Sequence, residues 1–290
     1  NMRHHVLTGL LVFVSLIALT GAAQAALAIR DYDAKVNDRF YDDPTDRAFV
    51  GEAYDWSGVG RDSGGKWVTM ISPSYFLTSD HAAASGLIDF YPGNDDSVAP
   101  LTYLVDSTTQ VGSTDLRVGK LLTPVDPSIA VYPILMHTAM SEYVGKEMFV
   151  YGSPERVGKN LVDSISSVTL GGRTTSSVWY DYDVPGSAIP GEARLQPGDS
   201  GGPSFIARGG TLSVVGIHWF TTVGDTDPIL SGDSFVPAYV PTIQGLMGKL
   251  LGAGKRALTG ESVFMTHFTN IAGSAKRHVA FAAPCPGKII

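Results

Sequence analysis

The chain has 290 residues, among them 33 Gly, 17 Pro and one Cys, and its formal net charge is −7. An acidic chain without a dense Lys/Arg cluster does not suit nucleic acid or an anionic membrane surface as a partner. With a single cysteine no disulfide can form within the chain, so stability must come from packing of a hydrophobic core.

The first 25 residues have the pattern of an export signal. Arg3 precedes an apolar run over residues 6–18, and residues 23–25 read Ala-Gln-Ala, the small-x-small pattern of a cleavage site. A membrane anchor is the alternative, but the run is short for a span and no charged flank follows it. We therefore expect a secreted or periplasmic protein without membrane contact after cleavage, with residues 26–48 as an N-terminal or pro segment.

Short runs rich in β-branched and aromatic residues alternate with Gly and Pro, which predicts an all-β fold. The expected strands are, in chain order, 67–71, 75–78, 101–105, 116–122, 147–151, 161–170, 177–182, 203–207, 212–219 and 235–239. After Pro241, the apolar residues Ile243, Leu246, Met247 and Leu250 recur at helical spacing. This pattern predicts a C-terminal helix that docks on the body.

The segment from Gly60 to Lys66 fits the Gly-x-x-x-x-Gly-Lys pattern of a phosphate-binding loop. Trp67, however, stands where a Ser or Thr should hold magnesium, and the chain runs into a strand instead of opening a helix. We interpret the segment as a hairpin loop.

Residues 198–203 read Gly-Asp-Ser-Gly-Gly-Pro, which describes a serine nucleophile in a turn with flexible backbone. The same letters fit the nucleophile elbow of an α/β-hydrolase, for which Asp233 and His267 could follow Ser200 in the required order. An elbow has to turn directly into a helix, and the Gly-Gly-Pro that follows the serine resists helix formation. The sequence therefore favours a base that precedes Ser200 in the chain over one that follows it.

Two upstream segments supply such a base and an acid to orient it. His81 directly follows the apolar strand expected at 75–78, and Asp115 opens an alternating run at 115–121. Each residue alone is more often structural. Together, the order His81, Asp115, Ser200 is the order used by chymotrypsin-like enzymes.

From about Phe49 to Leu251 the chain resembles the chymotrypsin-like serine peptidases. The resemblance rests on five segments: Leu-Thr-Ser-Asp-His at 77–81, Asp-Leu at 115–116, Phe-Val-Tyr-Gly at 149–152, the serine motif at 198–203, and Val-Gly-Ile-His-Trp at 215–219. It implies a peptidase domain at 49–252, made of two packed antiparallel six-stranded β-barrels, at about 49–140 and 141–240, and a C-terminal helix at 241–252. The role of residues 253–290, with Cys285, is left open.

The resemblance also implies the mechanism and the substrate. Ser200 would attack the carbonyl of a peptide or protein substrate, His81 would carry the proton, and Asp115 would fix the imidazole. The N–H groups of Gly198 and Ser200 would form the oxyanion hole, with no cofactor and no metal. Asp106 and Asp126 are the other candidates for the acid.

The strand that includes His218 resembles that of bacterial glutamyl endopeptidases, in which the histidine contacts an acidic side chain before the cleaved bond. Arg194, six residues before Ser200, is expected near the floor of the same pocket. Together they favour an acidic residue before the cleaved bond. Trp219, Phe220 and Thr221 are expected to line the same substrate-binding strand. The alternative is that His218 is a buried structural residue and Arg194 faces solvent.

Three features depart from the family pattern. Asp80 precedes His81, and if it faces the cleft its charge should raise the pKa of the imidazole. Family members often pair a new N-terminus, made by cleavage, with the residue that corresponds to Asp199. Cleavage near Phe49 could supply it here, but the usual start sequence is not evident, and Asp199 could have another partner. Phe220 stands where a pocket wall usually carries a small residue, so an inactive binding protein with a peptidase fold is the alternative function.

Overall fold

The structure is a computed structural model that describes residues 25–43, 45–137, 139–183, 189–222 and 229–255. The chain divides into one compact unit, residues 1–251, and a second at 252–290, of which only residues 252–255 are described. The expected export signal, apart from Ala25, and the tail with Cys285 lie outside the described residues. No helix in the described ranges is long and apolar enough to cross a membrane.

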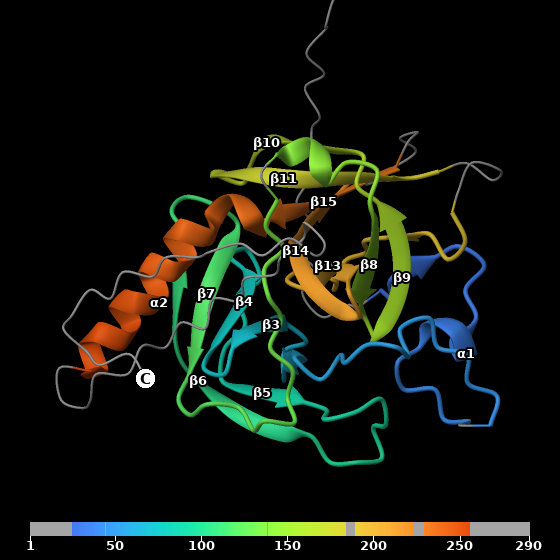
Figure 1. The fold of residues 1–290 in the computed structure, drawn as a ribbon, viewed down its shortest axis with the longest axis horizontal. Helices are drawn as coiled ribbons and strands as arrows, with labels where there is room; N and C mark the ends of the chain where they lie inside the picture. Colours follow the sequence, from blue (N-terminus) through green and yellow to red (C-terminus); the bar gives the residue numbers. More distant parts are fainter. Residues whose placement is uncertain (1–24, 44, 138, 184–188, 223–228, 256–290) are drawn as a thin grey trace, which may run out of the picture. The chain divides into compact units, whose positions relative to one another are not determined.

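Six antiparallel strands of the N-terminal half close into a barrel (Figure 1). In chain order they are β2 Val59–Asp62, β3 Trp67–Ser72, β4 Tyr75–Ser79, β5 Leu87–Phe90, β6 Leu101–Gln110 and β7 Leu116–Leu121. Around the barrel their order is β2-β3-β4-β7-β6-β5. Fully buried side chains such as Met70, Phe76 and Ile88 fill the interior. Closure leaves no free strand edge, which makes the barrel a rigid support for residues at its strand ends.

The C-terminal half is a seven-stranded antiparallel sheet with the order β10-β11-β15-β14-β13-β8-β9. Its strands are β8 Glu147–Gly152, β9 Arg156–Leu161, β10 Ser164–Leu170, β11 Arg173–Tyr182, β13 Pro203–Arg208, β14 Thr211–Thr221 and β15 Ile229–Phe235. Its own core contains Val150, Tyr180 and Val215, all fully buried.

Short elements complete the unit. They are the paired strands β1 Ala28–Ile29 and β12 Ala193–Arg194, helix α1 Ala34–Asn37, the 3-10 turns η1 Met140–Glu142 and η2 Val236–Tyr239, and helix α2 Val240–Lys255. Helix α2 packs on the barrel, because Ile243 and Met247 are buried in a cluster with Tyr75 of β4, whose hydroxyl donates to the Met247 carbonyl at 3.2 Å.

A third core joins the two halves through aromatic side chains. Trp67 of the barrel meets Tyr151 of β8 edge-on, with ring centroids 5.4 Å apart. Trp56 stacks on Tyr151 at 5.5 Å and meets Phe205 of β13 at 5.8 Å. Large aromatic surfaces buried in this way contribute more than their contact area alone. The junction is therefore a packed interior, and the residues discussed below lie along it.

The structure confirms the prediction of an all-β fold with a six-stranded antiparallel barrel and a C-terminal helix. The prediction of a second six-stranded barrel at about 141–240 is wrong: this half is a seven-stranded sheet, because strand β9 at 156–161 was not expected and the strand expected at 161–170 begins at 164 as β10. The last expected strand, 235–239, is the turn η2: the strand itself lies earlier, at 229–235, and Pro237 cannot donate to a ladder. Residues 63–66 connect β2 and β3, as a hairpin loop does.

Candidate active site

The side chains of His81, Asp115 and Ser200 meet although they lie far apart in the sequence. His81 follows β4 and Asp115 precedes β7, and these strands are antiparallel neighbours, with Ser79 paired to Leu116. Nδ1 of His81 lies 2.7 Å from Oδ2 of Asp115, and Nε2 lies 2.8 Å from Oγ of Ser200, which comes from the loop between β12 and β13. The backbone N–H of His81 donates to Oδ1 of Asp115 at 2.9 Å. The three residues form one continuous hydrogen-bonded chain.

The environment of this chain is set by burial. Asp115 is fully buried, while the side chain of His81 keeps 19% of its surface exposed. Burial raises the pKa of Asp115, against the opposing hydrogen bonds and charge of His81 and the charge of Arg173. A carboxylate at Nδ1 favours the tautomer with its proton on Nδ1, so that Nε2 offers a lone pair to the Ser200 hydroxyl. Such an arrangement can remove the proton from a serine nucleophile.

Strand β11 of the C-terminal sheet holds Asp115 from the other side. The hydroxyl of Thr175 accepts a hydrogen bond of 2.9 Å from the backbone N–H of Asp115. Nε of Arg173 lies 3.2 Å from Oδ1 of Asp115. The hydroxyl of Ser234 on β15 donates to the Asp115 carbonyl at 3.3 Å. Asp115 thus sits on the barrel but takes its hydrogen-bond partners from both halves of the fold.

Two backbone N–H groups in the loop that carries Ser200 have no acceptor within the described ranges. Three of the five in residues 198–202 donate within the chain: Asp199 to the Gln196 carbonyl at 3.0 Å, Gly201 to His218 at 3.0 Å and Gly202 to Asp199 at 2.9 Å. Those of Gly198 and Ser200 have no acceptor among the described residues. Gly198 has φ 111°, a conformation that L side chains rarely adopt. The two predicted oxyanion donors are therefore the two that remain available to a ligand.

The fully buried side chain of Asp199 holds the same loop in place. It accepts two hydrogen bonds of 2.7 Å, from the backbone N–H groups of Ser153 and Gln196. Burial raises its pKa to about 7, although these hydrogen bonds and the charge of His218 act in the opposite direction. In this structure Asp199 thus has backbone partners in place of the new N-terminus considered above.

Asp80, which precedes His81 in the sequence, lies in a small cluster of charges. Its carboxylate accepts from Arg173 at 2.6 Å, from Arg117 at 3.0 Å and from Gln110 at 3.2 Å. Two guanidinium groups therefore face the charge of Asp80. The effect of the Asp80 charge on the imidazole of His81 stays a prediction. The two guanidinium groups should make this effect smaller.

His218 lies inside the C-terminal sheet, fully buried. Nδ1 lies 2.8 Å from Oδ1 of Asp233, which also accepts from the Tyr180 hydroxyl, and Nε2 lies 3.0 Å from the Tyr151 carbonyl. Burial by itself lowers the pKa of His218, but the charge and hydrogen bond of Asp233, with Asp199, raise it above its ordinary value. In this conformation both ring nitrogens are engaged by the chain, and neither is offered to a substrate.

The other residues expected at the substrate pocket are spread over three environments. Arg194 is half-buried, with its guanidinium carbon 5.4 Å from the Tyr182 ring. Trp219 and Phe220 are buried against one another, with ring centroids 5.2 Å apart. Thr221 is half-buried, and its hydroxyl donates to the Leu230 carbonyl at 3.2 Å.

Phe220 occupies space that a glycine leaves open. A Cβ placed on Gly232 would lie 2.2 Å from Cζ of Phe220, so the ring lies directly on the Gly232 backbone. Trp179 closes the other side, at 4.9 Å between ring centroids. The Phe220 ring therefore fills space beside β14 in which a substrate side chain was expected.

The two other candidates for the acid lie away from His81. Asp106 pairs with Lys120 at 2.8 Å on the exposed face of the barrel, and Asp126 accepts from the backbone of Ser128. Within the described ranges no group of three or more His, Cys, Asp or Glu side chains is placed to hold a metal ion.

Sequence reasoning missed the supporting residues of the site. Thr175, Arg173 and Trp67 contact it through pairings between distant strands, and no local pattern links their positions to Asp115 or Ser200. For Trp67 the large buried side chain at the start of a strand was a weak signal, since its indole N–H needs a partner when buried.

Comparisons with known proteins give a partial family match and distant structural likenesses. The family model described as Mitochondrial biogenesis AIM24 matches residues 231–290, a segment that contains none of the three triad residues. No curated protein matches the chain. Among solved structures the chain is similar to the NS6 protease of murine norovirus, at 19% identity, TM-score 0.40, covering 62% of this chain and 90% of that one. The chain is also similar to an inactive mutant of that protease with a C-terminal extension. The identity is 19% and the TM-score 0.41, and the match covers 62% of this chain and 92% of that one.

Proposed function

We propose that this protein is a hydrolase that uses a serine nucleophile, and more particularly a serine endopeptidase of the chymotrypsin-like type. The observation that carries the proposal is the hydrogen-bonded chain Asp115–His81–Ser200, next to two N–H groups that have no acceptor among the described residues. A base within reach of the nucleophile, a carboxylate that orients the base and free donors nearby are what acyl transfer needs.

The proposed reaction has two stages. Ser200 Oγ attacks the carbonyl carbon as its proton passes to Nε2 of His81, and the N–H groups of Gly198 and Ser200 stabilise the oxyanion. His81 then gives the proton to the leaving amine, so that the peptide bond breaks and an ester with Ser200 remains. Water attacks this ester with His81 again as base, which releases the acid and restores the serine.

The test is covalent labelling by a fluorophosphonate, followed by cleavage of a peptide library. Labelling of the wild-type protein at Ser200, and its loss in Ser200→Ala, are the expected results. Circular dichroism of the variant should be unchanged, because His81 is the hydrogen-bond partner of the Ser200 hydroxyl within the described part of the chain. Equal labelling of both proteins would reject the assignment of the nucleophile.

An acidic preference before the cleaved bond is part of the same proposal. With His218 enclosed by Asp233 and the Tyr151 carbonyl, Arg194 is the cation left to supply it. The peptide library tests this directly: cleavage mainly after Lys or large apolar residues would reject it.

A catalytically inactive binding protein is the second candidate, favoured by the packing of Phe220 on Gly232. It predicts a folded protein that neither takes the fluorophosphonate nor cleaves any library peptide. In both cases we propose a secreted or periplasmic location, which N-terminal sequencing of the protein from culture supernatant or periplasm tests by a start at Ala26.

A further inference from the structure

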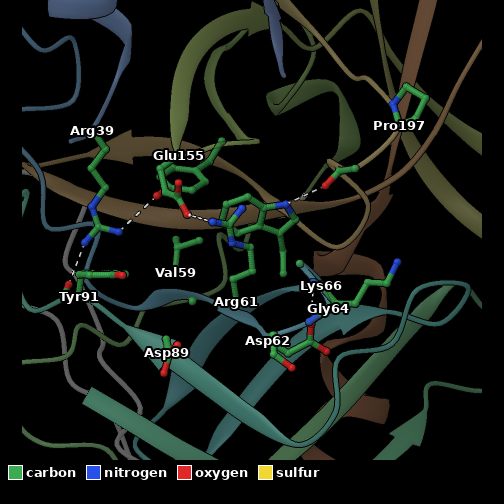
Figure 2. A pocket seen from close by; sticks show the side chains of 16 residues that line it. Arg39, Val59, Arg61, Asp62, Gly64, Lys66, Asp89, Tyr91, Glu155 and Pro197 are labelled. Carbon is green, nitrogen blue, oxygen red and sulfur yellow. Dashed lines mark hydrogen bonds and ion pairs between the residues drawn. The ribbon is translucent and has the colours of Figure 1, made fainter. Parts of the chain in front are cut away.

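A cavity of about 740 Å³ opens beside the loop that carries Ser200 (Figure 2). The hairpin formed by β2 and β3 supplies one wall, Tyr151 and Glu155 supply another, and Pro197 and Gly198 border it from the nucleophile loop. Its volume lies within the range of about 300–1,000 Å³ typical of ligand sites. The cavity therefore borders Gly198, one of the two residues proposed as oxyanion donors.

The position of the cavity relative to β14 decides which part of a substrate it can receive. In the proposed function the substrate before the cleaved bond runs along β14, at Trp219 to Thr221. No residue of β14 lines the cavity, which borders the loop at Pro197 and Gly198. A chain whose carbonyl carbon lies at Ser200 would therefore enter the cavity with the residues that follow the cleaved bond.

Most charges in the cavity are already used by the protein. Arg39 is buried and donates to the carbonyls of Tyr91 and Gly93 at 2.8 Å and 2.7 Å. Arg61 pairs with Glu155, with 2.8 Å between NH2 and Oε1. The guanidinium of Arg61 is therefore engaged by Glu155.

The acidic side chain nearest Lys66 in the sequence is also occupied. The carboxylate of Asp62 accepts three backbone N–H groups, from Gly64 at 2.9 Å, Lys66 at 2.8 Å and Ser85 at 3.0 Å. These three donors hold the carboxylate of Asp62 in place against the backbone.

Asp89 also lines the cavity and accepts from the Thr102 hydroxyl at 2.6 Å, which leaves Lys66 as the charged side chain of the lining with no partner among the described residues. The backbone N–H of Lys66 donates to Asp62 at 2.8 Å, but its ammonium has no partner among the described residues. The side chain is half-buried, and Figure 2 shows it at the same end of the cavity as Pro197, with Arg39 and Tyr91 at the opposite end. An unpaired ammonium on a fixed backbone is a ready partner for a carboxylate.

We infer that this cavity binds the substrate on the carboxyl side of the cleaved bond, and that Lys66 selects an acidic side chain there. The inference rests on the proposed function and adds the class of substrate: polypeptides with Asp or Glu within the first few residues after the bond. Lys66 is a specificity-determining residue, separate from the proton transfer at His81.

The test uses peptide pairs that are identical up to the cleaved bond. Within each pair, one of the first three residues after the bond is either Glu or Gln, and the readout is the ratio of the two kcat/KM values. For the wild type we expect a ratio of about ten in favour of Glu at one position. Lys66→Gln should bring it near one, and Lys66→Glu should invert it. Lys146→Gln, which removes an exposed lysine outside the cavity, should keep the wild-type ratio.

A small chromogenic ester with no residue after the bond separates the two proposals. If the wild type cleaves this ester and depends on Ser200, but the Glu/Gln ratios of wild type and Lys66→Gln are equal at all three positions, the inference is overturned and the proposed function stands. A wild-type preference for Gln over Glu also overturns it. If neither ester nor peptides are cleaved and the fluorophosphonate does not react, both fail.

Discussion

The indole Nε1 of Trp67 donates a hydrogen bond of 3.0 Å to the carbonyl oxygen of Gly198. Trp67 belongs to the closed barrel, whereas Gly198 lies in the loop of the candidate nucleophile. The other end of the same peptide group, the Asp199 N–H, donates to the Gln196 carbonyl at 3.0 Å. This peptide is therefore held at both ends, and the orientation of the neighbouring N–H groups depends on it.

Removing the indole donor should lower activity more than stability. In Trp67→Phe the ring packing is largely kept, but the Gly198 carbonyl loses its partner, and we expect kcat to fall about tenfold. Trp179→Phe is the matched control, because the buried indole N–H of Trp179 has no hydrogen-bond partner among the residues that the structure describes. Steady-state kinetics on the chromogenic ester checks both variants, and equal kcat values for the two would contradict the expectation.

Asp115→Asn should keep the fold and lose turnover. The amide can accept from the backbone N–H of His81, but it cannot hold Nδ1 in the tautomer that frees Nε2, nor stabilise the imidazolium. A fall in kcat of about 10⁴ is expected. Asp106→Asn, which removes the exposed carboxylate paired with Lys120, should stay within a factor of two of the wild type. A loss of less than tenfold in Asp115→Asn would mean that another group orients His81.

Gly202→Ala should destabilise the nucleophile loop. The added Cβ would lie 2.7 Å from the Tyr151 carbonyl oxygen and 2.8 Å from Cδ2 of His218, and neither the strand nor the buried ring can move away easily. We expect a loss of about 1–3 kcal/mol in the free energy of unfolding, measured by urea denaturation, together with lost activity. Gly245→Ala in helix α2, where nothing lies within 4 Å, is the control and should be neutral or stabilising.

Glu155 should make the protein less stable as the pH rises. Burial raises its pKa from 4.5 to about 7, against the opposing charges of Arg61 and Arg39. Between pH about 4.5 and about 7 the folded state binds more protons than the unfolded state, so the free energy of unfolding falls with rising pH, by at most about 3 kcal/mol. Glu155→Gln does not ionise and should show a smaller fall between pH 5 and pH 8. Parallel pH profiles for the two proteins would show that Glu155 titrates normally.

The sequence predicted the parts of the fold and site that have local signatures. The alternation around β3, β4 and β7 and the Pro241-initiated helix are visible within windows of a few residues, and the order of His81, Asp115 and Ser200 is a property of the chain alone. Strand β2 was missed because Gly60 has no side chain to show a pattern; its reason is spatial, since a Cβ there would lie 2.6 Å from the Phe90 ring.

What the sequence could not reveal are contacts that depend on the pairing of the two halves. Arg173 and Thr175 lie on a strand whose own pattern says nothing about Asp115. The enclosure of His218 is of the same kind, because its partner Asp233 comes from the neighbouring strand in register with it. A histidine on an apolar strand suits both a pocket and a core, and only the register distinguishes them.

The placement of Asp115 has a consequence for the order of events during folding. Because its backbone is held by Thr175 and its carboxylate by His81 and Arg173, the nucleophile, base and acid are in place only once the barrel and the sheet have joined. A nascent chain in which only the barrel has folded lacks the proposed catalytic arrangement. If the protein is the peptidase we propose, peptidase activity appears only after the barrel and the sheet have joined, and chains that are still folding do not cleave one another.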